Sequence, residues 1–145
     1  MVNQFEKNLS KLRRAADDIA GYLADAHIGL YKTAVPASEA TVKADITAVI
    51  ANFDGYAEAN IDWLAPSIAD DGEVEVVGTV PEFRPTGATT PNSIVGAFIT
   101  ANSDDALLFF GNIDNAPVEL AATTDALVLT VRYRPLGPTM TISVS

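Results

Sequence analysis

From residue 27 onward, the sequence consists of short apolar or alternating segments separated by turns rich in glycine, proline, asparagine and aspartate. This pattern is typical of β-strands, because the turn residues tolerate the tight backbone angles that end each strand. Eight such strands in antiparallel order predict a β-sandwich. We expect the strands at residues 27–32, 56–64, 73–83, 93–101, 106–110, 117–121, 126–134 and 139–144.

Most of these segments have one apolar side and one polar side. In the segment 126–134, Leu129 and Val131 alternate with polar residues, which predicts one buried and one solvent-facing side. The segment 93–101 is instead apolar on both sides. We therefore expect it to be a central strand that is covered on both faces, with Gly96 marking a bulge or a close contact.

The N-terminal region follows a different period, with an apolar residue every three or four positions. This spacing lines one side of a helix, so we predict an amphipathic helix over residues 2–25. A short helix within residues 38–50 is weaker, because the segment is rich in β-branched residues. The chain then divides into an N-terminal helical segment at 1–26 and a sandwich domain at 27–145. The apolar stripe of the helix consists of Val2, Phe5, Leu9, Leu12, Ile19 and Leu23, with Ala16 between them.

Lys7, Lys11 and Arg14 lie at positions i, i+4 and i+7 of the same helix, and they form a basic line away from the apolar stripe. Two interpretations of the stripe stay open. It packs on its own domain or a neighbour, or it joins helices of different copies in a dimer or trimer. We predict that the stripe and the basic line together form an interface.

Charge and composition exclude several classes of protein. With 19 acidic and 9 basic residues, the net charge of −10 disfavours binding to a nucleic-acid backbone. No apolar run is long enough to span a membrane, and the charged N-terminus does not resemble a secretory signal. The absence of cysteine removes disulfides, thiolate metal sites and cysteine nucleophiles. Neither nucleic acid nor a membrane is an expected partner.

The segment 50–66 is the strongest candidate for chemistry, because it places acidic and amide side chains around Gly55. If Gly55 is the sixth residue of an EF-hand loop, the first and last calcium ligands would be Ile50 and Ile61, which cannot bind a cation. We therefore interpret the segment as a turn followed by a strand. On that strand Trp63 faces the core and Tyr56 faces solvent.

Other catalytic arrangements are no better supported. Glu58 and Asp62 are too far apart on one strand to act as a carboxylate pair, while Glu73 and Glu75 are typical of a solvated edge strand. His27 is the only histidine, and no nucleophile motif accompanies it. We predict that the protein is not an enzyme, with no catalytic, cofactor-binding or metal-binding residues and no cofactor.

Five short motifs occur in order along the chain. A strand containing "LY" is followed by a turn ending in "GY", a strand ending in "W.AP", a "VGAFIT" strand and a closing "L.L.VRY" strand. Over residues 27–135 this pattern resembles a group of tailed-bacteriophage virion proteins. The resemblance implies a jelly-roll-like β-sandwich that acts as a capsid decoration or cement protein, or as the base of a head fibre.

These observations together predict a mainly β protein, an antiparallel jelly-roll-like sandwich preceded by an amphipathic helix. The expected role is that of a non-enzymatic structural protein on the outer surface of the capsid of a virion. Its partners would be the major capsid protein and further copies of itself. The alternative is a carbohydrate-binding or host-binding module of a tail or fibre, although the expected loops contain few of the aromatic residues that such sites use.

Overall fold

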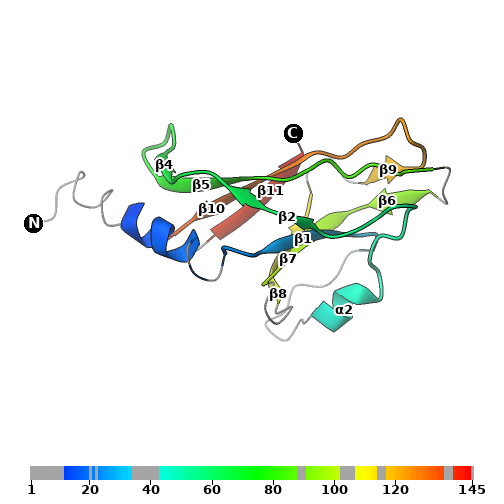
Figure 1. The fold of residues 1–145 in the computed structure, drawn as a ribbon, viewed down its shortest axis with the longest axis horizontal. Helices are drawn as coiled ribbons and strands as arrows, with labels where there is room; N and C mark the ends of the chain where they lie inside the picture. Colours follow the sequence, from blue (N-terminus) through cyan, green and yellow to red (C-terminus); the bar gives the residue numbers. More distant parts are fainter. Residues whose placement is uncertain are drawn as a thin grey trace, which may run out of the picture.

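The computed structural model describes residues 12–19, 21, 23–33, 43–87, 91–101, 107–113, 117–135 and 139–144. These residues form two antiparallel sheets with a helix before the first strand, so the predicted mainly β sandwich is confirmed (Figure 1). One sheet has the strand order β2-β1-β7-β8. The other has the order β11-β10-β5-β3, with β4 also paired to β5, and β6 and β9 form a separate two-stranded ribbon.

The helices of the described residues are the N-terminal helix at residues 12–19 and α2 at Lys43–Thr47. The strands are β1 (His27–Tyr31), β2 (Ala59–Asn60), β3 (Asp62–Trp63), β4 (Ser67–Ile68), β5 (Val74–Thr79), β6 (Asn92–Ile94), β7 (Gly96–Thr100), β8 (Leu107–Asn112), β9 (Val118–Leu120), β10 (Leu129–Arg134) and β11 (Thr139–Val144).

The main hydrophobic core lies between the two sheets. Ile28 and Leu30 of β1 and Ile99 of β7 point into it from the four-stranded sheet, and all three are fully buried. Val131 of β10 and Ile142 of β11 meet them from the five-stranded sheet. The alternation in the sequence therefore predicted the buried side of β10 correctly.

Two predicted strands are each divided between different sheets. The segment 56–64 contains β2 in one sheet and β3 in the other, because the chain crosses between the sheets at buried Ile61. The segment 93–101 breaks at Val95, where β6 pairs with β9 and β7 pairs with β1. The crossing at Ile61 keeps the apolar alternation of the segment 56–64, and the segment 93–101 is apolar on both sides, so the pattern alone could reveal neither division.

The solvent-facing position predicted for Tyr56 is wrong. Its ring packs on the main core, with the ring of Phe53 at a centroid distance of 5.3 Å and that of Phe83 at 6.3 Å. Its hydroxyl accepts a hydrogen bond from the backbone N–H of Leu30, 3.0 Å away. β2 pairs only with His27 and Ile28, the first two residues of β1. The hydroxyl of Tyr56 therefore supplies the acceptor that a neighbouring strand would otherwise offer to the N–H of Leu30.

A helix covers the outer face of the four-stranded sheet. Ile46 of α2 is fully buried and packs with Tyr31 of β1 and Phe98 of β7 in a second cluster. Because Ala97 and Ile99 of β7 point into the main core, the predicted covering of this strand on both faces is confirmed.

Gly96 lies in close contact with the neighbouring strands, as its position in an apolar strand predicts. The ring of Tyr31 lies directly over it, and a Cβ atom there would also lie 2.6 Å from the carbonyl oxygen of Gly111. In the neighbouring pair the ring of Phe98 lies over Gly29 in the same way. The two rings can approach the backbone this closely only because glycine has no side chain.

The N-terminal helix is shorter than predicted in the part of the chain that the structure describes. It extends over residues 12–19, and the chain then turns, with the N–H of Leu23 donating to the carbonyl of Asp18 at 3.1 Å. The predicted helix over residues 23–25 is therefore wrong, while residues 2–11 lie outside the described residues. Ala15 is buried and Ala16 is exposed, so the stripe contains Ala15 at this point.

Replacing Gly96 by alanine should lower the free energy of unfolding by about 1–3 kcal/mol, the usual cost of overpacking a well-packed site. The added methyl group would meet the ring of Tyr31 and the carbonyl of Gly111. Gly111→Ala is the matched control, because its Cβ would come no closer than 3.3 Å to the ring of Phe109. Urea unfolding followed by Trp63 fluorescence measures both. Equal stability of the two variants would show that the ring does not lie on Gly96.

Burial raises the pKa of Tyr56 to about 12. Because the unfolded protein would release this proton near pH 10, the stability that Tyr56 contributes is present below pH 10 and is lost as the pH rises toward 12. The loss can reach about 3 kcal/mol. Tyr56→Phe should reduce this alkaline loss, and it should cost about 1–3 kcal/mol at neutral pH by leaving the N–H of Leu30 without its acceptor. Urea unfolding at pH 7 and pH 11 tests both effects, and an identical pH profile of the two proteins would contradict this role.

Candidate functional site

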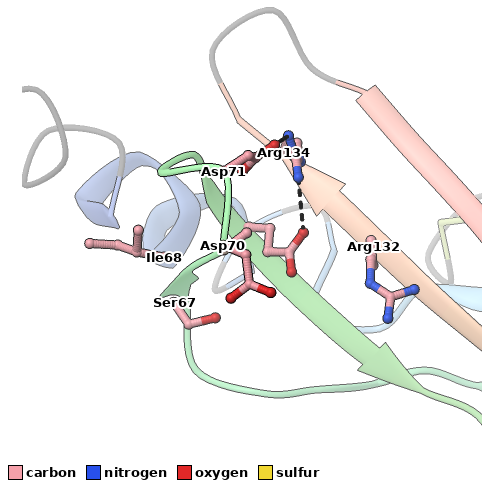
Figure 2. Close-up of a pocket in the computed structure, with 8 residues that line it drawn as sticks. Ser67, Ile68, Asp70, Asp71, Arg132 and Arg134 are labelled. Atoms are coloured by element: carbon pink, nitrogen blue, oxygen red, sulfur yellow. Dashed lines mark hydrogen bonds and ion pairs between the residues drawn. The ribbon is translucent and has the colours of Figure 1, made fainter.

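A shallow groove lies on the outer face of the five-stranded sheet (Figure 2). One wall is the turn between β4 and β5, and the opposite wall is formed by side chains of β10. Its volume is about 570 Å³. The groove is lined by Ser67, Ile68, Ala69, Asp70, Asp71, Glu75, Arg132 and Arg134.

Arg134 connects the two walls of the groove. Its guanidinium group lies 2.8 Å from a carboxylate oxygen of Asp71 and 3.5 Å from one of Glu75, and Figure 2 shows these contacts as dashed lines. The hydrogen bond from Arg134 is the main reason that the pKa of Asp71 is lowered, and the same bond raises the pKa of Arg134. The Asp71 pair is open to solvent, so it orients the turn more than it stabilises the fold.

Arg132 is the free cation of the groove within the described residues. Its guanidinium group donates to the hydroxyl of Ser143 at 3.2 Å and forms no ion pair with a described carboxylate. Figure 2 shows Arg132 apart from the contacts of Arg134, on the side of the groove opposite Ser67 and Asp70. One positive group and one acidic side therefore face each other across the groove.

Two exposed apolar side chains accompany this groove. Ile68 of β4 is 52% exposed, and Leu64, whose N–H donates to the carbonyl of Val77 on β5, is 50% exposed. They are the most exposed large hydrophobic residues of the described chain, and both belong to the edge formed by β3 and β4. We call the groove together with Leu64 and Ile68 the groove face.

The groove face combines two exposed apolar side chains with charged groups of both signs. None of the eight residues that line the groove is aromatic or a histidine. Within the residues that the structure describes, no three His, Cys, Asp or Glu side chains come together to hold a metal ion. The groove presents one serine hydroxyl, three carboxylates and two guanidinium groups.

The described residues of the predicted helix stripe lie against the protein's own sheet. Leu12, Ile19 and Leu23 pack in a third cluster with inner-face residues at the end of the five-stranded sheet. Figure 1 shows the helix at that end of the sandwich, near β4 and β5. The inner-face residues of the sheet in this cluster are Val74, Val76 and Tyr133.

Two hydrogen bonds fasten this part of the chain to the sheet. The hydroxyl of Tyr133 donates to the carboxylate of Asp18 at 2.7 Å, and the indole N–H of Trp63 donates to the carbonyl of Leu23 at 2.7 Å. Trp63 also packs on the main core and on the helix cluster, so its predicted role as a core anchor is confirmed. Arg14 of the basic line remains exposed, 3.8 Å from Asp18.

The remaining predicted interface residues lie outside the described residues. They are Val2, Phe5, Leu9, Lys7 and Lys11. His27 is the first residue of β1, where it pairs with Asn60 and Thr100.

The sequence pattern alone does not indicate the groove face as a site. It predicted correctly that Arg132 and Arg134 lie on the solvent-facing side of their strand. It could not show that the turn after β4 folds back toward them, because that contact joins residues about sixty positions apart in the sequence. The available signal was two apolar residues, Leu64 and Ile68, on either side of a proline.

Comparison of the chain with models of protein families, with curated proteins and with solved structures finds no match to any of them. Among the described residues, no helix is both long enough and apolar enough to cross a membrane.

Proposed function

We propose that this chain is a non-enzymatic structural protein of a bacteriophage virion that decorates or cements the outer surface of the icosahedral capsid. The support from the sequence is the resemblance of residues 27–135 to tailed-phage virion proteins. The support from the structure is a mainly β sandwich with one open face suited to binding a protein. The partner in this proposal is the major capsid protein.

The observation that carries the proposal is the exposure of Leu64 and Ile68 beside the groove. Each leaves about half of its side chain in water, although nearby Val74 and Ile61 are almost fully buried. Exposed apolar surface that is rimmed by polar residues is one mark of a protein-binding site. Covering the two side chains would remove apolar surface from water and so stabilise a complex.

The charges of the groove face indicate how a partner would be oriented. The chain as a whole carries a net charge of −10, so a partner with an acidic surface would be repelled except near an available cation. Arg132 is such a cation, because within the described chain it pairs with no carboxylate. We infer that a carboxylate of the partner reaches Arg132 while its apolar side chains cover Leu64 and Ile68.

The N-terminal helix would contribute only its solvent-facing side to the contact with the capsid. Its described stripe residues are packed against the helix's own sheet, so the contact would come from the solvent-facing side of the helix, where Arg14 lies. A basic side chain there would add to the attraction of an acidic shell. The groove face supplies the apolar contact, and the basic line of the helix supplies charge.

The alternative is a host-binding module of a tail or fibre that binds a glycan in the groove. Ser67, Asp70 and Arg132 offer hydrogen-bonding groups that a sugar could use. The groove has no aromatic lining residue on which a sugar ring could stack. The composition of the groove therefore favours a protein partner.

Co-sedimentation with undecorated phage heads tests the proposed function. The double variant Leu64→Ser/Ile68→Ser should bind at least about tenfold more weakly, because it loses the apolar contact without disturbing the core. Val128→Ser is the matched control, since Val128 is 39% exposed and does not line the groove. It should bind like the unmodified protein.

Two results would contradict the proposal. Unmodified protein that does not sediment with the heads at micromolar concentration would exclude decoration of that capsid. Binding of purified host polysaccharide that requires Arg132, without binding to heads, would replace decoration by the tail or fibre function.

A further inference from the structure

The two sheets leave two strand edges side by side on one side of the sandwich. β8 ends the four-stranded sheet and β11 ends the five-stranded sheet, and the two strands approach each other without pairing. On the opposite side of the sandwich the chain itself passes from β2 to β3 at Ile61. The edge of β11 is therefore a row of backbone N–H and C=O groups that has no strand partner in the described part of the chain.

β11 lacks the features that usually protect an edge strand. Its sequence, TMTISV, contains no charged residue and no proline, and it pairs with β10 in regular register along all six residues. β8 is a poorer template, because its pairing with β7 shifts register between Ile99 and Thr100. Bulges, charges and proline are the common defences against edge pairing, so the regular and neutral strand is the one open to a partner.

The opposite edge of the same sheet is protected. β3 and β4 have two residues each, and Asp62, Asp70 and Asp71 lie in or beside them. A second copy of this acidic chain would meet like charges there. At β11 it would meet none from the strand itself, so β11 offers a strand edge at which two copies with a charge of −10 can approach with little repulsion.

We propose that β11 pairs antiparallel with β11 of a second copy of this chain, across a two-fold axis, and joins the two five-stranded sheets into one. A two-fold axis pairs β11 of one copy with β11 of the other, so the free N–H and C=O groups of one strand meet those of the same strand in the second copy. An axis perpendicular to the sheet also keeps Thr141 and Ser143 on the solvent-facing side in both copies. Apolar Ile142 stays on the core side in both.

A hollow adjoins the edge of β11. It has a volume of about 360 Å³ and lies between β8 and β11, and Phe109, Met140 and Ile142 are among the residues that line it. Val144, at the end of β11, is 39% exposed and would be covered by the partner. Since six paired residues bury little surface, we expect a dissociation constant on the order of micromolar.

This inference differs from helix-to-helix assembly, in which the stripe of the N-terminal helix would join the copies. The described stripe residues Leu12, Ile19 and Leu23 are already packed against their own sheet. Pairing through β11 leaves that packing intact. It also does not depend on the proposed function, because it concerns the isolated protein in solution.

The test uses two charged variants at the same position, Thr141→Lys and Thr141→Glu. Thr141 is exposed, so both variants should fold, and circular dichroism checks this. Thr141→Lys alone should dissociate at least about 100-fold more readily than the unmodified protein, because like charges would face each other near the axis. Thr141→Glu alone should dissociate more readily by a smaller factor, because Arg132 of the same subunit lies opposite position 141. An equimolar mixture of the two should restore the dimer, because opposite charges then meet. Sedimentation equilibrium measures all three samples.

Asn60→Lys, on the edge strand β2 at the opposite side of the sandwich, is the matched control and should leave the dimer unchanged, because Asn60 is exposed and lies outside the groove face. Hydrogen exchange of the unmodified protein gives a second measurement. Exchange of the β11 amides should slow as the concentration rises through the dissociation constant. A monomer at 100-fold above micromolar concentration, a dimer that survives both Thr141 variants, or a mixture that does not reassociate would overturn the proposal.

Discussion

The packing of aromatic rings on glycines of the neighbouring strand holds both sheets in their observed register. Phe98 lies over Gly29 in one sheet, and Trp63 lies over Gly78 in the other, where a Cβ atom would come within 2.9 Å of the indole ring. A shift of register by one residue would place each ring against a side chain instead of a bare backbone. The rings therefore fix which residues face the core, and every surface described above depends on that choice.

Trp63 links the main core to the N-terminal helix. The ring packs on both the main core and the helix cluster, and its N–H binds the carbonyl of Leu23. The helix thereby takes the place of a second sheet over the inner face of Val74 and Val76. Consequently, its described apolar side chains belong to the fold of one subunit, and the groove face and the β11 edge are surfaces that stay open in the described part of the chain.

Much of this arrangement could be predicted from the local pattern of the sequence. The bounds of β11, the turn at Gly55 with its positive φ of 84°, and the double covering of β7 all followed from residue types within a few positions of each other. The covering of Phe98 by α2 explains why that strand is apolar on both sides. These features are local, so the sequence displays them directly.

The parts that could not be predicted depend on residues far apart in the chain. Tyr56 is polar enough for a solvent-facing position, and its burial depends on the ring of Phe83 and on the N–H of Leu30, which donates to its hydroxyl. The crossing at Ile61 keeps the alternation of the sequence while changing sheets. The groove face likewise exists because Arg134 meets Asp71 across 63 positions. Neither apolar periodicity nor turn signals contain information of this kind.

The central claim is that the helix stripe belongs to the subunit's own core while the groove face is the surface that binds a capsid. Hydrogen exchange compared between free protein and protein bound to phage heads tests it most directly. We expect the amides of residues 64–75 to exchange more slowly on the particle, because the partner covers them, while those of residues 12–19 exchange as in the free protein. Slower exchange confined to residues 12–19, with no change at residues 64–75, would contradict the claim.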